Sequence, residues 1–207
     1  KFFILLSSFT VLKKYRRLLF VDVETTGLDP TKDRIIEIGA VRIDRDGNLG
    51  KYSRLINPGF KISREIRKLT GIKQKDLANA PLLEEIADEV KDVLKTDLFI
   101  AHNAKFDFDF FSKEMLRLDF PVELPYIDTI KIAKIFYPNY LSYDLTSLID
   151  RMGFNINKRH RGFDDAYILW ELFNKITKDF GIEELESKID KLFVPSKKTK
   201  RITSKDQ

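Results

Sequence analysis

The order of its apolar segments constrains the fold of this chain more than any other feature. Three strand-like segments come first, at residues 18–23, 34–43 and 52–56, and the last two flank a turn at Asp46-Gly47. Two further short strands, at 97–101 and 126–127, then alternate with segments of helical spacing. A three-strand antiparallel meander followed by strands that alternate with helices predicts an α/β fold. We therefore expect a mixed sheet with parallel strands and helices on both faces.

The helical segments follow the apolar spacing of about 3.6 residues. They are expected at 63–69, 73–77, 82–94, 105–118, 129–136, 145–152, 163–180 and 182–192. Asp128 is placed to cap the helix that follows it, and Gly153 to end the helix before it. The chain has 207 residues and no internal repeat, so it is long enough for one well-buried domain, which we place at 18–193.

The charges lie mainly at the two ends of the chain. The net charge is +5, and the segment 1–17 contains basic residues and no acid, so we interpret it as a basic and apolar extension. The end of the chain, 194–207, is rich in Lys, Thr and Ser and is predicted to be a disordered basic tail. The body between them is mildly acidic. An acidic body binds a polyanion poorly unless cations neutralise it, so the charge pattern favours bound metal ions.

Two classes of protein are disfavoured by composition. The chain has no cysteine, which excludes disulfides, thiolate metal sites and a cysteine nucleophile, and fits a reducing compartment. We expect a cytoplasmic protein. The apolar run near the start is far shorter than the roughly 20 residues that cross a bilayer, and no small-residue cleavage site follows it. No membrane partner is expected.

Two carboxylates end the first strand. Asp22 and Glu24 are two residues apart, so their side chains leave the same face of the sheet. Like charges at adjacent positions on one face repel each other unless a cation lies between them. The alternative, a solvated strand end, is about equally probable from this pair alone.

Two more acidic segments follow strands or loops that can meet the first. Asp107 stands in the first turns of a helix directly after a strand, where sites gather in open α/β sheets. Asp109, two positions on, points elsewhere on the helix and is expected to be solvated. His160 lies in a polar loop, and Asp165 in the first turn of the longest helix. A lone histidine near a helix start is usually a surface residue, so only the acidic residues found with it favour a functional role for His160.

Together these residues supply four carboxylates, one imidazole and no thiol. An all-oxygen set suits the hard cations Mg²⁺ and Mn²⁺ better than Zn²⁺. Two such ions about 4 Å apart clamp the attacking and leaving oxygens of an in-line phosphoryl displacement. The sequence has no glycine-rich phosphate loop, which disfavours a kinase or a P-loop phosphatase.

The three segments read DVETTG, AHNAKFD and HRGFDDA in chain order. In this order they resemble the DEDD exonuclease superfamily in its histidine-bearing branch, and most of all the epsilon-type proofreading exonucleases of bacterial DNA polymerase III. The likeness runs from about residue 18 to residue 180. The resemblance implies a ribonuclease-H-like fold, two divalent ions, Mg²⁺ or Mn²⁺, and hydrolysis in the 3′→5′ direction.

The resemblance also implies a role for each matching residue. Asp22, Glu24, Asp107 and Asp165 match the four metal-binding carboxylates, and His160 matches the general base, a duty that its ordinary pKa of about 6.5 suits. The positions near the terminal nucleotide are matched by Thr25, Leu28, His102, Asn103 and Phe106. Leu28 is placed to wedge against a base, and Phe106 either to pack under one or to belong to the core.

Three functions are compatible with these residues. The first is a DNA exonuclease that acts on single-stranded or frayed 3′ ends in proofreading, with a DNA polymerase subunit as partner, or in repair. The second is an exonuclease that trims RNA or degrades oligoribonucleotides, because contacts to the 2′ position are not visible in the sequence. The third is a nucleic-acid-binding module without catalysis, which the presence of all five site residues disfavours.

Overall fold

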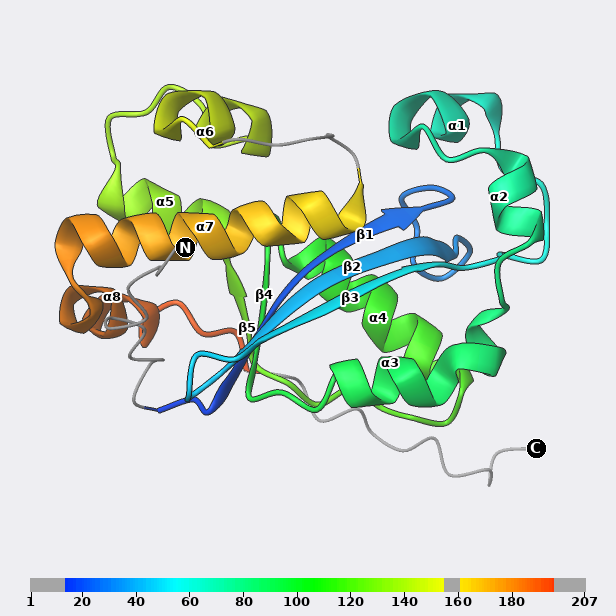
Figure 1. The fold of residues 1–207 in the computed structure, drawn as a ribbon, viewed down its shortest axis with the longest axis horizontal. Helices are drawn as coiled ribbons and strands as arrows, with labels where there is room; N and C mark the ends of the chain where they lie inside the picture. Colours follow the sequence, from blue (N-terminus) through cyan, green and yellow to red (C-terminus); the bar gives the residue numbers. More distant parts are fainter. Residues whose placement is uncertain (1–13, 155–160, 196–207) are drawn as a thin grey trace, which may run out of the picture.

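A computed structural model describes residues 14–154 and 161–195 of the chain, and within them five strands form one mixed sheet (Figure 1). The strands are β1 (Arg17–Thr25), β2 (Ile35–Asp44), β3 (Leu49–Leu55), β4 (Leu98–Ala101) and β5 (Tyr126–Asp128). Their order across the sheet is β3-β2-β1-β4-β5. The β1–β2 and β2–β3 pairs are antiparallel, and the β1–β4 and β4–β5 pairs are parallel. The predicted meander with added parallel strands is confirmed.

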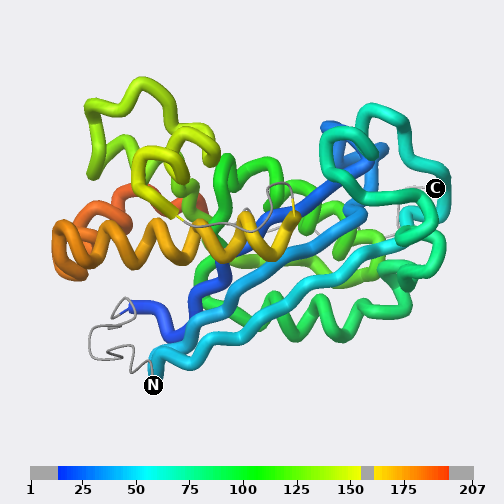
Figure 2. The backbone as a smooth tube through the Cα atoms, turned by 45° about the horizontal axis from the view of Figure 1, so that its top comes forward, coloured from blue at the N-terminus to red at the C-terminus, as the bar shows by residue number. Residues whose placement is uncertain are grey.

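Helices cover both faces of this sheet, as predicted (Figures 1 and 2). The helices are α1 (Arg64–Thr70), α2 (Gln74–Ala78), α3 (Ala87–Val93), α4 (Lys105–Arg117), α5 (Thr129–Phe136), α6 (Leu145–Met152), α7 (Gly162–Phe180) and α8 (Ile182–Ile189). Helices α5 to α8 share one apolar cluster with one face of the sheet, and α3 and α4 share a second cluster with the other face. In Figure 1 the long helix α7 crosses the sheet on the first of these faces.

Strand β1 is buried on both faces, which explains its continuous apolar sequence. Leu18 and Phe20 point into the cluster under α7, whereas Leu19 and Val21 point into the cluster under α4. Phe20 meets Phe173 of α7 edge to face, with 5.1 Å between ring centroids. Each such side chain contributes about 1.5–3 kcal/mol by leaving water. The apolar residues thus fix which face of β1 each of its side chains occupies.

Local signals set most element ends. Gly47 adopts a φ of 80° in the β2–β3 hairpin and donates its N–H to the Asp44 carbonyl at 3.1 Å. Gly153 ends α6 with a left-handed φ of 69°, and the Asp128 carboxylate accepts the N–H of Ile130 at the start of α5. These three predictions are confirmed.

The helix predicted over 82–94 is wrong in its first part. A 3-10 helix, η1 (Leu83–Ile86), comes before α3. The Glu85 carboxylate accepts the N–H of Leu82 at 2.7 Å, and this contact closes a tight turn directly after Pro81. Helical spacing in the sequence does not separate such a turn from an α-helix.

The described ends of the chain pack on the domain. Tyr15 is buried against Phe193, with 5.1 Å between ring centroids, and Val194 forms a β-bridge with Tyr126. Residues 1–13 and 196–207 lie outside the described residues, so the extension, the domain limits and the disordered tail stay predictions. No helix within 14–154 and 161–195 has the length and apolar character needed to cross a membrane.

Candidate active site

A cleft of about 360 Å³ lies where β1 and β4 end. Its walls come from the end of β1, the β4–α4 junction, and the first turns of α5, α6 and α7. The lining residues are Asp22, Val23, Glu24, His102, Phe106, Asp107, Ile130, Asp144, Leu145 and Asp165. All four carboxylates singled out in the sequence therefore face one space, although they come from three segments that are far apart along the chain.

Three of these carboxylates form a close group. Asp22 and Glu24 have the same parity along β1 as Phe20, so they leave the sheet on the face that α7 covers. Asp165 stands in the first turn of α7 and is 4% exposed. One ligand atom from each of the three lies within 4.8 Å of the other two. Such a group offers several oxygens to one small region of space.

Asp107 reaches the same region from the opposite side of β1. The β1–β4 pairing ends at Phe20 and Ile100, so the N–H of Val23 lies beyond it. The Asp107 carboxylate accepts that N–H at 3.1 Å. Burial raises the pKa of Asp107, and the charges of Glu24 and Asp128 raise it further. A metal-free site therefore favours the protonated form of Asp107.

Asp109 is separated from this group, as predicted. It lies on the outer surface of α4, where it forms an ion pair with Lys105 one turn earlier, and its side chain is 39% exposed. Asp107 is 4% exposed by comparison. The rotation of the helix thus divides two aspartates that are two residues apart in the sequence.

The five residues predicted to contact the terminal nucleotide occupy different environments. His102 and Phe106 line the cleft, and the His102 Nδ1 lies 2.9 Å from the Thr129 hydroxyl. Leu28 is 84% exposed. Asn103 has a left-handed φ of 61°. Thr25 is buried, and its hydroxyl donates to the Gly27 carbonyl at 2.6 Å, so its oxygen is already engaged in the loop after β1.

His160 lies outside the described residues, since 155–160 are not among them. Its neighbour Arg161 is described, and it is bound to the buried Glu37 of β2. Sequence reasoning missed Glu37, and it missed Asp144 as a cleft residue. Asp144 caps α6 by accepting the N–H of Ser147 at 2.9 Å, and the Asp–Leu–Thr–Ser order at that helix start was the available signal.

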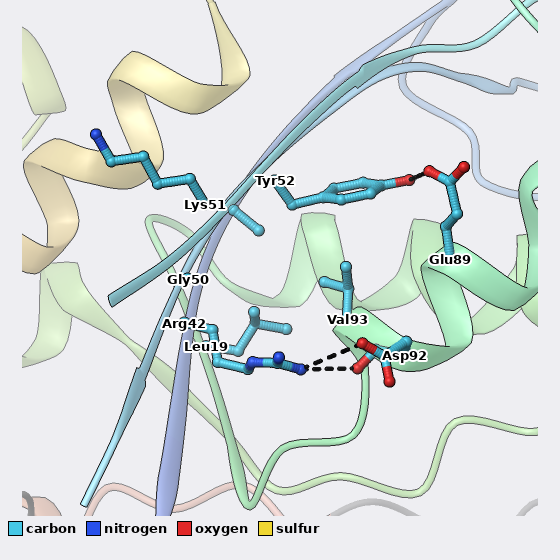
Figure 3. Close-up of a pocket in the computed structure, with 9 residues that line it drawn as sticks. Leu19, Arg42, Gly50, Lys51, Tyr52, Glu89, Asp92 and Val93 are labelled. Carbon is cyan, nitrogen blue, oxygen red and sulfur yellow. Dashed lines mark hydrogen bonds and ion pairs between the residues drawn. The ribbon is translucent and has the colours of Figure 1, made fainter. Parts of the chain in front are cut away.

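A second cavity, of about 410 Å³, lies between β2, β3 and α3 (Figure 3). Two pairs of its polar groups contact each other across the space. Arg42 donates to the Asp92 carbonyl at 3.1 Å, and the Tyr52 hydroxyl lies 3.5 Å from the Glu89 carboxylate. Acidic and basic side chains are therefore both present in this cavity, whereas the described lining of the first cleft has acidic residues without lysine or arginine.

The order of the strands and the acidic cleft at the end of β1 define a ribonuclease-H-like α/β protein. The family model described as RNase T exonuclease matches residues 19–173. The chain belongs to this exonuclease family, which confirms the resemblance carried by its three motifs.

Relatives and solved structures agree with this assignment. The DNA polymerase III epsilon subunit of Treponema pallidum is 37% identical over 73% of this chain and 72% of its own length. A PolC-type DNA polymerase III from Thermotoga petrophila is 39% identical over 82% of this chain. The chain spans only 13% of that polymerase. The structure of exonuclease X with 5′-overhanging duplex DNA is 25% identical, covers 83% of this chain and 97% of its own, and has a TM-score of 0.63.

Proposed function

We propose that this chain is a metal-dependent 3′→5′ exonuclease that releases nucleoside 5′-monophosphates from DNA. The observation that carries the proposal is the convergence of four carboxylates, Asp22, Glu24, Asp107 and Asp165, on one cleft. They come from three separate elements, and folding alone brings them together. Family membership makes nucleic acid the substrate class that fits this cleft.

The donor set fits two divalent cations. The described residues that line the cleft include several acidic side chains and neither lysine nor arginine. Asp22, Glu24 and Asp165 offer oxygens within 4.8 Å of one another, and oxygen donors without thiolate suit Mg²⁺ or Mn²⁺. We assign these three and Asp107 as the ligands of both ions.

Divalent ions, when bound by these residues, would supply positive charge to the phosphodiester and would lower the pKa of a nearby water. The remaining duty of the protein is proton transfer and positioning. We assign His160 as the base that takes a proton from the water, because an imidazole with an ordinary pKa of about 6.5 accepts protons near neutral pH. It is one residue from Arg161, whose guanidinium is tied to β2.

The loop after β1 is built to hold Leu28 outward. The Thr26 hydroxyl donates to the Asp33 carboxylate at 3.1 Å, and the same carboxylate accepts the Asp29 N–H at 2.9 Å. An apolar side chain that is 84% exposed on such a cross-linked loop is suited to contact a base. We propose that Leu28 contacts the terminal base, with Phe106 and His102 on the cleft wall.

We propose that Asn103 and Thr25 contribute through their backbone groups. The Asn103 N–H donates to the Asp128 carboxylate at 3.1 Å, which holds the β4–α4 turn beside the cleft. Thr25 contributes through its backbone, because its hydroxyl is engaged with Gly27. Both residues thereby shape the region near the terminal nucleotide.

The names of similar proteins favour DNA as the substrate. Exonuclease X was solved with 5′-overhanging duplex DNA, and two similar proteins are DNA polymerase III chains. We propose single-stranded or frayed 3′ ends as the substrate, a role in proofreading or repair, a polymerase subunit as partner, and a cytoplasmic location. An RNA-trimming activity is the alternative within the same chemistry.

The test is digestion of three 5′-labelled strands with Mn²⁺ or Mg²⁺. They are single-stranded DNA, a duplex with a mismatched 3′ end, and an RNA of the same sequence. We expect a ladder that shortens by one nucleotide at a time from the 3′ end, fastest on DNA. Faster digestion of RNA would establish the alternative. Binding without cleavage would indicate a non-catalytic module, and internal cuts would refute the exonuclease assignment.

A further inference from the structure

The junction between β2 and the start of α7 contains an ion pair outside the cleft lining, between the buried carboxylate of Glu37 and the partly exposed guanidinium of Arg161. Glu37 stands opposite Glu24 in the β1–β2 register and is 1% exposed. Its Oε1 accepts from Arg161 Nε at 3.1 Å and from Arg161 Nη2 at 3.0 Å, and its Oε2 accepts the Gly162 N–H at 3.3 Å. One carboxylate therefore holds both the residue before α7 and the first residue of that helix.

The backbones of the two elements touch at the same point. A Cβ added to Gly39 of β2 would lie 1.7 Å from the carbonyl carbon of Gly162. A Cβ added to Gly162 would lie 3.0 Å from the backbone oxygen of Asp22. The first turn of α7 thus rests directly on the strands, beside the residue that begins the carboxylate group.

Helix α7 lacks the usual side-chain cap. Arg161 occupies the N-cap position and makes no capping hydrogen bond with its side chain. The Glu37 carboxylate binds the free N–H of Gly162 in its place. One turn on, the Asp165 N–H donates to the Arg161 carbonyl at 3.1 Å. A chain of hydrogen bonds therefore connects the backbone of Asp165 to Arg161, and Arg161 to the carboxylate of Glu37.

Stability alone does not explain a carboxylate in this place. An ion pair that buries a carboxylate is weak support for a fold, because apolar residues of similar volume commonly stabilise as well or better. Glu37 also adds a negative charge beside Glu24 and close to the other acids. The charge of Arg161 compensates it, so the pair orients backbone groups without adding net charge. In addition to packing, such a pair fixes the position of the backbone at the start of α7 relative to β2.

We propose that Glu37 is a positioning residue, which clamps Arg161 and the Gly162 N–H and so sets where Asp165 stands relative to Asp22 and Glu24. The effect of this clamp on activity rests on the proposed function, because the clamp sets the distances between residues that we assign as metal ligands. It also fixes the residue that directly follows His160.

The test replaces Glu37 with glutamine, which keeps the volume and removes the charge. Glu114→Gln is the matched control. Glu114 is also buried, binds Arg34 Nε at 2.8 Å and accepts the Ile35 N–H at 3.3 Å, and it makes these contacts from α4. Glu114 also pairs with Arg117 at 3.1 Å. Both variants therefore lose one buried negative charge that binds arginine and a backbone amide, but only Glu37→Gln removes that charge from the contact with α7.

The first measurement needs no activity. Hydrogen exchange of the amides of 162–165 is followed in the metal-free proteins. We expect faster exchange in Glu37→Gln and unchanged exchange in Glu114→Gln, even where both variants melt earlier than the wild type. Equal exchange of these amides in the wild type and Glu37→Gln would overturn the clamp, whatever the activity of the protein.

The second measurement follows Mn²⁺ affinity and turnover. Residues that orient metal ligands change affinity or activity by about 10–100-fold when replaced, so Glu37→Gln should lose about that factor in Mn²⁺ affinity and in kcat, with little change in KM. Arg161→Lys, which retains the charge, should lose less than Arg161→Ala. A variant Glu37→Gln with the Mn²⁺ affinity and kcat of Glu114→Gln would refute positioning. A wild type without nuclease activity would refute the proposed function and leave the exchange result to judge the clamp.

Discussion

Asparagine in place of Asp107 removes the charge of a deeply buried carboxylate and keeps its shape. Asp107 is 4% exposed, and its Oδ1 accepts the Val23 N–H at 3.1 Å, a contact that an amide oxygen retains. Burial raises its pKa, and Glu24 and Asp128 raise it further. The folded state keeps this carboxyl protonated near neutral pH, where the unfolded chain ionises it, and asparagine removes that cost, worth about 1–3 kcal/mol. A chain of this size gains roughly 2–4 °C per kcal/mol, so the melting temperature of the metal-free variant should be about 2–12 °C higher than that of the wild type.

The sign of the pH dependence follows from the raised pKa. The folded wild type retains a proton on Asp107 that the unfolded chain loses above about pH 4. Metal-free stability should therefore fall as pH rises from there toward the raised folded pKa of Asp107. Asparagine does not titrate, so the advantage of Asp107→Asn should grow over the same window. The readout is the melting temperature at about pH 5 and about pH 8.

Asp109→Asn is the control on the same helix. It breaks an exposed ion pair with Lys105, which is worth about 0.3–0.5 kcal/mol. Millimolar Mn²⁺ should raise the melting temperature of the wild type and Asp109→Asn, because an ion that binds only the folded state stabilises it. The same Mn²⁺ should have little effect on Asp107→Asn, which should also lose nuclease activity. An equal loss of activity in Asp109→Asn and Asp107→Asn would refute the choice of Asp107 as the site aspartate. A lower melting temperature of Asp107→Asn than of the wild type, both without metal, would refute the stability cost of the buried carboxyl.

Three further changes test separate parts of the structure. Gly39→Ala should lower the free energy of unfolding, measured by urea denaturation, by more than about 4 kcal/mol, because the added Cβ would lie 1.7 Å from Gly162. In the control Gly50→Ala the nearest atom is 3.7 Å away, so its free energy of unfolding should change little. Equal losses in the two variants would contradict the close approach of β2 and α7. His160→Ala should lose about 10²–10⁴-fold in kcat and keep its Mn²⁺ affinity; a defect confined to KM would exclude its role as base. Leu28→Ala should raise KM for single-stranded DNA without a change in melting temperature, because the side chain is 84% exposed; an unchanged KM would remove Leu28 from the binding surface.

Features encoded by local periodicity were predictable from the sequence. β1 is apolar on both faces, and the alternation of its side chains follows directly from its extended backbone. The same alternation placed Asp22 and Glu24 on one face, and helical rotation separated Asp107 from Asp109. The strand-end rule placed Asp107 near Asp22 and Glu24, because the carboxyl ends of neighbouring parallel strands meet at one edge of a sheet. The place of Asp165 beside them was implied by the family resemblance and not by this rule.

Contacts between distant segments were not predictable in the same way. Glu37 and Arg161 are 124 residues apart, and within its own strand Glu37 has the pattern of an ordinary polar residue. Only the packing of α7 on β2 brings the two together. Thr25 is a second example, because its hydroxyl is engaged by the Gly27 carbonyl. That contact depends on the conformation of the loop, which the residue types do not specify.

If the clustered carboxylates bind the ions needed for 3′-end hydrolysis, then a chelator should stop the reaction. Removal of nucleotides from a 5′-labelled DNA strand is followed in excess EDTA, and again after Mn²⁺ is added beyond the chelator. We expect no digestion in EDTA, full recovery with Mn²⁺ in the wild type, and no recovery in Asp22→Asn. Digestion that continues in EDTA, or that Asp22→Asn recovers with Mn²⁺, would contradict the metal-dependent mechanism.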